Sequence, residues 1–145
     1  MMVQNDTVRL LRECDAGIKM GVSSINDVID TISDRGFRNC LSECRREHKV
    51  LEKEINVLLD QYGDEGKEPG IMAKSMSHMK TGIRLGLDSS DATAADLLTD
   101  GCNMGVKSLN RYLNQYKAAD EVSKDIAKRL INLEEQLATD LRGYL

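Results

Sequence analysis

Apolar residues recur at alternating spacings of three and four along most of this chain. The clearest run contains Phe37, Leu41, Cys44, His48, Leu51, Ile55 and Leu58. This spacing places all its members on one side of a helix, so it predicts a long helix from about residue 37 to 62 that faces a bundle core. A histidine at a core-facing position is the unusual member of the run.

The same pattern predicts three more long helices and no strand, so the expected fold class is all-α. The first helix begins near Asn5 or Asp6 and the last begins after Asp120, because these residues are favourable N-caps. The third covers about residues 91 to 117. Gly36 suits the left-handed position that follows the first helix. The core-facing residues are Val8, Leu11, Asp15, Ile18, Val22, Ile25, Ile29 and Ile32 in the first helix, Leu98, Cys102, Gly105, Leu109, Tyr112 and Tyr116 in the third, and Val122, Ile126, Leu130, Leu133, Leu137, Leu141 and Tyr144 in the last.

Four helices of similar length predict a four-helix bundle formed by a single domain over residues 1–145. The connection over residues 63–90 is too long for a simple hairpin, and residues 71–87 predict a short helix with Met72, Met76 and Met79 on one side. We therefore expect a long, helix-containing crossover between helices two and three, as in ferritin-like bundles. The alternative is an up-down-up-down bundle with the short helix capping one end.

Composition narrows the possible partners and compartment. The net charge is −4 and aromatic residues make up only 3% of the chain, which argues against binding to nucleic acid. No apolar stretch approaches the roughly 20 residues that span a bilayer, so no membrane is expected. The N-terminal residues lack a secretory signal, which favours a cytoplasmic protein with reduced cysteines.

A crossover would make helices two and three parallel and bring Cys44, His48 and Cys102 into one central layer. Leu133 of the last helix lies at about the same depth. In this layer His48 fits a neutral core histidine that is hydrogen-bonded to a neighbouring side chain. Burial would then lower its pKa below the usual value of about 6.5.

A metal site is the alternative reading of this layer. Cys40, Cys44 and His48 lie at i, i+4 and i+8 on one side of a helix, and Cys102 or Glu47 could supply a fourth ligand. Thiolate and imidazole are the ligands that zinc prefers. The cysteines could equally be small core residues.

Asp15 and a pair of glycines are two further features of the predicted helices. Asp15 marks either the point where the first helix leaves the core and meets water, or a paired carboxylate in a polar layer, with Lys53 as a possible partner. Gly101 and Gly105 lie four residues apart on the third helix, which favours a close approach between helices.

Four stretches of the chain resemble a known group of proteins. They are Met79-Lys80-Thr81-Gly82, Asp88-Ser89-Ser90-Asp91, Leu97-Leu98 with Gly105, and Leu109-Asn110-Arg111-Tyr112. In these stretches and in its helix lengths the chain resembles small ferritin-like bacterial proteins of unknown function, which are relatives of rubrerythrin at the level of fold. That resemblance implies a di-iron site with one Glu from each of two helices and Glu-x-x-His from each of the other two.

The chain departs from this ligand pattern at the ligands themselves. Arg45 stands where the Glu that precedes His48 would be, and Val106 stands where a Glu would follow Gly105. The first helix offers Asn26 and Asp27 at this depth, and the last offers Glu134 and Glu135 with no histidine expected in reach. The resemblance therefore implies a bundle with a degenerate metal site.

We expect from these patterns a non-catalytic bundle with no cofactor, acting as an interaction or structural protein. Ala95, Val106 and Leu113 lie off the main stripe of the third helix, which favours a homodimer formed through helical faces. The alternative is a metal-binding protein that holds zinc or iron near His48. A di-iron oxidase is the less favoured alternative.

Overall fold

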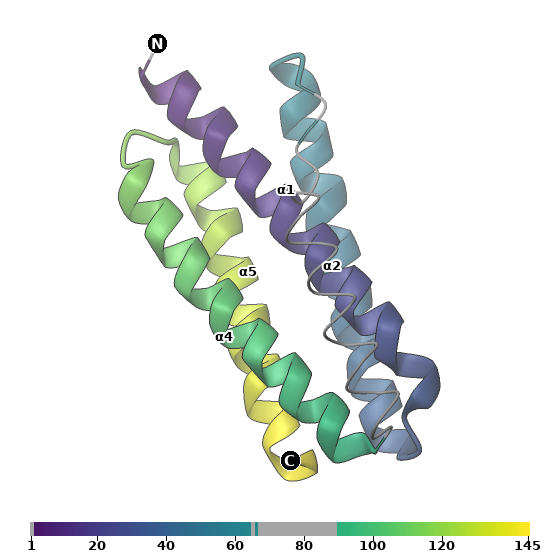
Figure 1. Cartoon of the computed structure of the whole chain (residues 1–145). Coiled ribbons are helices and arrows are strands. Elements are labelled where there is room, and N and C mark those ends of the chain that lie inside the picture. The colour runs from purple at the N-terminus through teal and green to yellow at the C-terminus, as the bar shows by residue number, and fades with distance from the viewer. Residues whose placement is uncertain (1, 65, 67–89) are drawn as a thin grey trace.

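The computed structural model describes residues 2–64, 66 and 90–145, and its long elements are four helices (Figure 1). They are α1 (Met2–Val28), α2 (Arg35–Gln61), α4 (Asp91–Gln115) and α5 (Glu121–Leu141). Single-turn 3₁₀ helices follow α1 (η1, Ile29–Thr31) and α5 (η2, Arg142–Tyr144). These residues contain no strand, which confirms the all-α class, and the helices pack as a bundle.

The helices form two antiparallel pairs, α1 with α2 and α4 with α5 (Figure 1). The pairs pack together through contacts of α1 with α4 and of α5 with both α1 and α2. The backbone N–H groups of Ser33 and Asp34 donate to the Asp91 carboxylate at 2.8 and 2.9 Å. The starts of α2 and α4 therefore lie side by side, and these two helices run in the same direction.

Most of the connection between α2 and α4 lies outside the described residues. This includes the helix predicted over residues 71–87 and its methionines Met72, Met76 and Met79. No helix in the described part of the chain is long and apolar enough to cross a membrane.

Side-chain caps fix the beginning of three helices. Asp34 accepts from the Phe37 N–H at 2.8 Å, Ser90 from the Thr93 N–H at 3.2 Å, and Asp120 from the Ser123 N–H at 2.8 Å. A carboxylate or hydroxyl in this position satisfies one of the amides that a helix start leaves unpaired. The cap predicted at Asp120 is confirmed.

The predicted start of the first helix is wrong, because α1 already includes residues 2–6. Asp6 accepts instead from the Ala118 N–H at 3.0 Å, and the Thr7 hydroxyl accepts from the Asp120 N–H at 2.8 Å. The polar residues that resemble a cap thus hold the loop between α4 and α5 against α1.

The turn between α1 and α2 also differs from the prediction. Gly36 lies within the first turn of α2, and the positive φ angles of the described glycines belong to Gly63 (69°) and Gly66 (88°), after α2. The Asp34 cap, together with η1, ends one helix and starts the next without a left-handed residue at Gly36.

The core consists of two apolar clusters, one toward each end of the bundle. The first cluster contains Leu10, Leu11, Cys14, Ile18, Leu51, Ile55, Leu59, Leu109, Ala119, Ile126, Ala127, Leu130 and Ile131. The second contains Ile25, Val28, Ile32, Phe37, Leu41, Cys44, Ala94, Ala95, Leu98, Cys102, Leu137 and Leu141. On every long helix the two clusters are separated by a gap of one to two turns, and the candidate site lies at this gap.

Candidate functional site

A buried polar layer lies where the two apolar clusters meet, and each long helix contributes one residue to it. These residues are Gly21 of α1, His48 of α2, Gly105 of α4 and Glu134 of α5. His48 is 1% exposed and Glu134 is 9% exposed. Because the stripe of α2 faces the core throughout, the histidine ring has no route to bulk water and must find its partners inside the bundle.

Both ring nitrogens of His48 have hydrogen-bond partners within the protein. Nδ1 lies 2.8 Å from the backbone carbonyl oxygen of Cys44 and 3.5 Å from its Sγ, and Nε2 lies 2.9 Å from Oε1 of Glu134. A carbonyl oxygen can only accept, so Nδ1 carries a proton. A carboxylate also only accepts, so a proton on Nε2 makes the ring an imidazolium facing an anion.

The protonation of His48 contradicts one prediction from the sequence. Burial alone lowers the pKa of His48, but its hydrogen bonds to Cys44 and Glu134 and the charge of Glu134 outweigh burial and raise the pKa to about 10. The expected burial and the expected hydrogen bond to a side chain are therefore confirmed. The prediction of a neutral ring with a lowered pKa is wrong, because it took no account of a carboxylate at Nε2.

The two glycines leave the space that the pair occupies. A Cβ on Gly21 would lie 3.2 Å from Nε2 of His48, which is tighter than an ordinary contact, and one on Gly105 would lie 3.6 Å from Cδ of Glu134. The distance at Gly105 is an ordinary van der Waals contact with a side chain of α5, so the close helix approach predicted there stays a prediction. The prediction for Gly101 is wrong, because a Cβ there would have no atom within 4 Å.

Two cysteines lie against the pair, Cys44 beside His48 and Cys102 beside Glu134, while Cys40 lies about two turns before His48 on α2. Burial raises the pKa of the Cys102 thiol, and the charge of Glu134 and a hydrogen bond to it raise it further. Cys40 is more accessible, and burial with the nearby Asp140 raises its pKa to about 11. Cys102 and Cys40 therefore remain protonated at neutral pH, a state in which a cysteine is a poor nucleophile and a poor metal ligand.

The predicted metal ligands are only partly brought together. His48, Cys44 and Cys102 lie close together at the central level of the bundle as expected, whereas Cys40 and Glu47 line an open groove at the surface between α2 and α5. In the described ranges 2–64 and 90–145, no three His, Cys, Asp or Glu side chains are arranged to hold a metal ion.

The donors required for a di-iron centre are also replaced. Arg45 donates to Oδ1 of Asn26 at 2.7 Å, so a cation and an amide are paired where the family pattern would place metal ligands. Val106 packs against the first apolar cluster. One carboxylate and one imidazole, already bonded to each other, do not fit a pair of irons.

Glu134 is the residue that sequence reasoning missed. The last helix was expected to have no histidine in reach, and this expectation is wrong, because Glu134 bonds to His48 across 86 residues of sequence. A signal was present, since Leu130, Glu134 and Leu137 keep the same spacing of three and four as Leu130, Leu133 and Leu137. Because Leu133 fits the pattern equally well, the spacing alone does not identify Glu134 as the core-facing residue.

Asp15 is a second buried charge, and the expectation that it meets water is wrong. It is 0% exposed and forms an ion pair with Lys19, whose Nζ lies 2.9 Å from Oδ2. The prediction that Asp15 forms a pair is therefore confirmed. Its partner, however, is Lys19, one turn along the same helix, and Lys53 is exposed to solvent.

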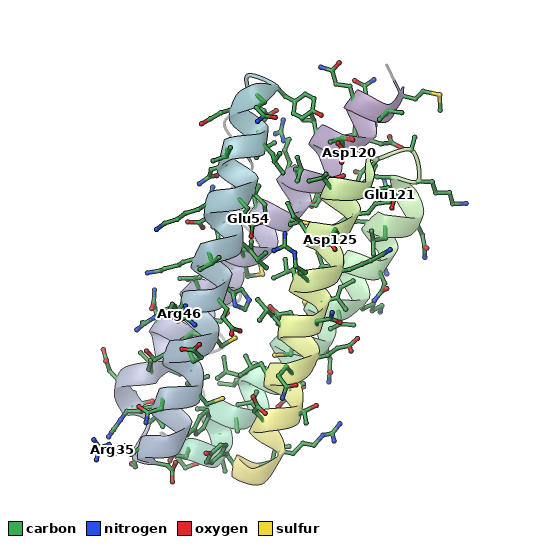
Figure 2. The ribbon with its side chains drawn as sticks, turned by 180° about the vertical axis from the view of Figure 1, so that it is seen from behind. Arg35, Arg46, Glu54, Asp120, Glu121 and Asp125 are labelled. Carbon is green, nitrogen blue, oxygen red and sulfur yellow. The ribbon has the colours of Figure 1, made fainter. Side chains whose placement is uncertain are left out.

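The contacts between α2 and α5 differ from one end of the two helices to the other. At one end Arg129 donates two hydrogen bonds to Glu54, at 3.0 and 2.9 Å, and a third to Asp125; Figure 2 shows Glu54 and Asp125 on these neighbouring helices. At the other end, where Cys40 donates to Asp140 at 3.9 Å, an open groove of about 420 Å³ lies between the helices. It is lined by Cys40, Glu43, Cys44, Glu47, Leu133, Gln136, Leu137, Asp140 and Tyr144.

Comparison of the chain with models of protein families, with curated proteins and with solved structures gave no match. The interpretation of the polar layer therefore depends on its geometry.

Proposed function

We propose that this chain is a non-catalytic, ferritin-like helical bundle that acts as a structural or interaction protein. The observation that supports it is the pairing of His48 with Glu134. Both ring nitrogens and one carboxylate oxygen are engaged within the layer where a di-iron bundle holds its metals. Groups that satisfy each other are not available to a metal or a substrate unless that pair is broken.

The direction of the helices supports the ferritin-like part of the proposal. The end of α2 lies one helix length from the start of α4, because α2 has 27 residues and the starts of the two helices are hydrogen-bonded through Asp91. The two ends that the connection joins therefore lie about 40 Å apart, as a crossover requires. A crossover of this kind, after the second long helix, is the connection that ferritin-like bundles use.

The homodimer part of the proposal needs a different surface from the side of α4 that the sequence favours. Ala95 is fully buried, and Val106 and Leu113 pack against the first cluster, so this side of α4 belongs to the core. Val50 and Val57 are exposed large apolar residues seven positions apart on α2. Their spacing places them on one outer side of that helix, which makes it the better candidate face.

Elemental analysis and iron loading test the non-catalytic proposal. Wild type and the His48→Gln variant, both purified without a histidine tag, would be analysed for zinc and iron, then loaded with ferrous iron without oxygen and exposed to air. We expect neither protein to retain stoichiometric metal or to develop oxo-bridged absorption.

Two other results would favour the alternatives. One zinc or iron per chain in wild type, absent from His48→Gln, would support a metal-binding protein at His48 and its neighbouring cysteines. Two irons per chain with oxo-bridged absorption would support a di-iron oxidase. Sedimentation of wild type and of Val50→Lys with Val57→Lys tests the dimer separately.

A further inference from the structure

We infer that the His48–Glu134 pair is a register lock, a buried contact that selects one alignment of the four helices from several that the apolar stripes would allow. This inference goes beyond the proposed function and does not depend on what the bundle binds. It rests on the position of the pair between the two apolar clusters and on the glycines that face it.

The apolar stripes alone define the alignment of the helices poorly. Each stripe repeats at spacings of three and four, and the residues one turn apart are mostly Leu, Ile, Val and Ala. Burial of apolar surface is non-directional and depends mainly on area. If α5 moved by one turn against α2, leucines would still meet leucines and isoleucines, so much of the burial would be kept.

The polar pair removes this freedom between α2 and α5. If α5 shifts by one turn, Oε1 of Glu134 is displaced by about 5 Å along the helix axis and no longer reaches Nε2 of His48, because a helix rises 1.5 Å per residue. Both groups would then lie among apolar side chains without their partner, and burying an unpaired charge is strongly unfavourable. Only the observed alignment satisfies the pair.

The glycines extend the lock to α1, and more weakly to α4, where a Cβ at Gly105 would make an ordinary contact with Glu134. On α1 the core residues next to Gly21 are Ile18 and Ile25, and on α4 those next to Gly105 are Cys102 and Leu109. A shift of α1 by about a turn would bring an isoleucine toward the ring, where even a Cβ at Gly21 would lie 3.2 Å from Nε2. The pair therefore fits where Gly21 stands and discriminates against neighbouring alignments of α1.

The surface pair between the same two helices provides the contrast. Arg129 and Glu54 are bonded bidentately, but their side chains are 43% and 42% exposed. If the helices shifted, water would replace the lost partner at little cost. We therefore expect this pair to hold the observed alignment only weakly, and it serves as the matched control.

The test replaces both members of the buried pair by apolar residues. We expect His48→Leu with Glu134→Leu to stay helical but to lose its single structure, with several sets of amide peaks in ¹H–¹⁵N spectra, increased binding of a hydrophobic dye and a mixture of oligomers. Glu54→Gln with Arg129→Gln should keep one set of peaks. A single set with native dispersion and oligomeric state in the leucine variant would overturn the inference.

A second pair of variants keeps the test decisive if the leucines do not fit. The unbranched side chains in His48→Met with Glu134→Met adapt to the same space, and the same loss of a single structure is expected. His48→Gln with Glu134→Gln restores a directional hydrogen bond without charge and should recover one set of peaks. If neither apolar variant folds, the pair is required for stability and not for selection, and the inference fails.

Discussion

His48 is held at both ring nitrogens by acceptors, and this arrangement decides its charge. The backbone carbonyl of Cys44 fixes a proton on Nδ1, and Glu134 stabilises a second proton on Nε2. Burial by itself favours the neutral ring. Together the two contacts keep an imidazolium between the two apolar clusters of the core.

This charge predicts a loss of stability on the alkaline side. The pKa of His48 is about 10 in the folded protein and about 6.5 in the unfolded chain. The folded state therefore binds more protons between these values, so its extra stability is fully present below pH 6.5 and is lost as the pH rises through 10. Urea unfolding between pH 6 and 10 should show a steeper fall in the free energy of unfolding for wild type than for His48→Gln.

The His48→Gln variant is the control for the other groups that titrate in this range, because it retains every tyrosine, lysine and cysteine. A difference between the two proteins that grew as the pH fell below 6.5 would contradict the charged pair. It would indicate the neutral core histidine instead.

Gly17 and Gly21 give a matched prediction on one face of α1. Both lie within the helix, where Ala is favoured over Gly by about 1 kcal/mol. A Cβ at Gly17 would meet Leu130 at 4.0 Å, an ordinary contact, whereas one at Gly21 would crowd His48, which its two hydrogen bonds hold in place. Gly17→Ala should stabilise the protein by roughly 0.5–1 kcal/mol in urea unfolding, and Gly21→Ala should give no gain or a loss. Equal gains at both positions would show that the ring can move away.

At the scale of elements, short polar contacts align the helix ends. Asp91 begins α4 and accepts from two backbone amides of the turn before α2, while Asp6 and Thr7 of α1 accept from the loop that precedes α5. Each contact joins a helix to a turn distant in the sequence. The two ends of the bundle are thus fixed by carboxylates and a hydroxyl acting on backbone amides.

Removal of the Asp91 contact should weaken the end of the bundle at which α2 and α4 begin. Asp91→Ala leaves the Ser33 and Asp34 amides without their charged acceptor and removes an acid from the first turn of α4. We expect a cost of about 1–2 kcal/mol in the free energy of unfolding. Asp100→Ala, on an exposed turn of the same helix, should change stability by less than about 0.5 kcal/mol. Similar effects at both positions would contradict the role given to Asp91.

At the scale of the whole molecule, the polar layer both divides and connects the core. It separates two apolar clusters, but His48 bonds α2 to α5 within it, and all four long helices pass through both clusters. Neither cluster can therefore lose its packing without disturbing helices that also form the other. The bundle behaves as one unit in this respect.

This continuity predicts a single cooperative unfolding transition. The helix signal in the far-ultraviolet and the protection of amides in each cluster against hydrogen exchange should be lost at the same urea concentration. Protection lost in one cluster at clearly lower urea than in the other would show that the polar layer separates two independent units.

Periodicity along the sequence predicts four long helices, the all-α class and the depth of the central layer, although α1 begins at Met2 and not near Asn5 or Asp6. Periodicity is a local property, so the stripes locate each helix, and counting along them placed His48, Cys102 and Leu133 at one level, one residue from Glu134. The tertiary structure decided which groups meet within that level. One residue along a helix turns the side chain by about 100°, so the choice between Leu133 and Glu134 depends on the rotation of α5 against α2.

Packing between distant parts of the chain also explains the other differences between the predictions from sequence and the structure. The partner of His48 is 86 residues away and the partner of Asp6 is 112 residues away, and no spacing within one helix encodes such contacts. Asp15 is buried, and Gly66, which follows α2 in the chain, lies against its carboxylate. Spacing therefore predicted most of the residues through which the helices face the core, but Val122 is 57% exposed and Leu59 is buried in place of Leu58. The charge of His48 and the burial of Asp15 were decided only by packing between helices.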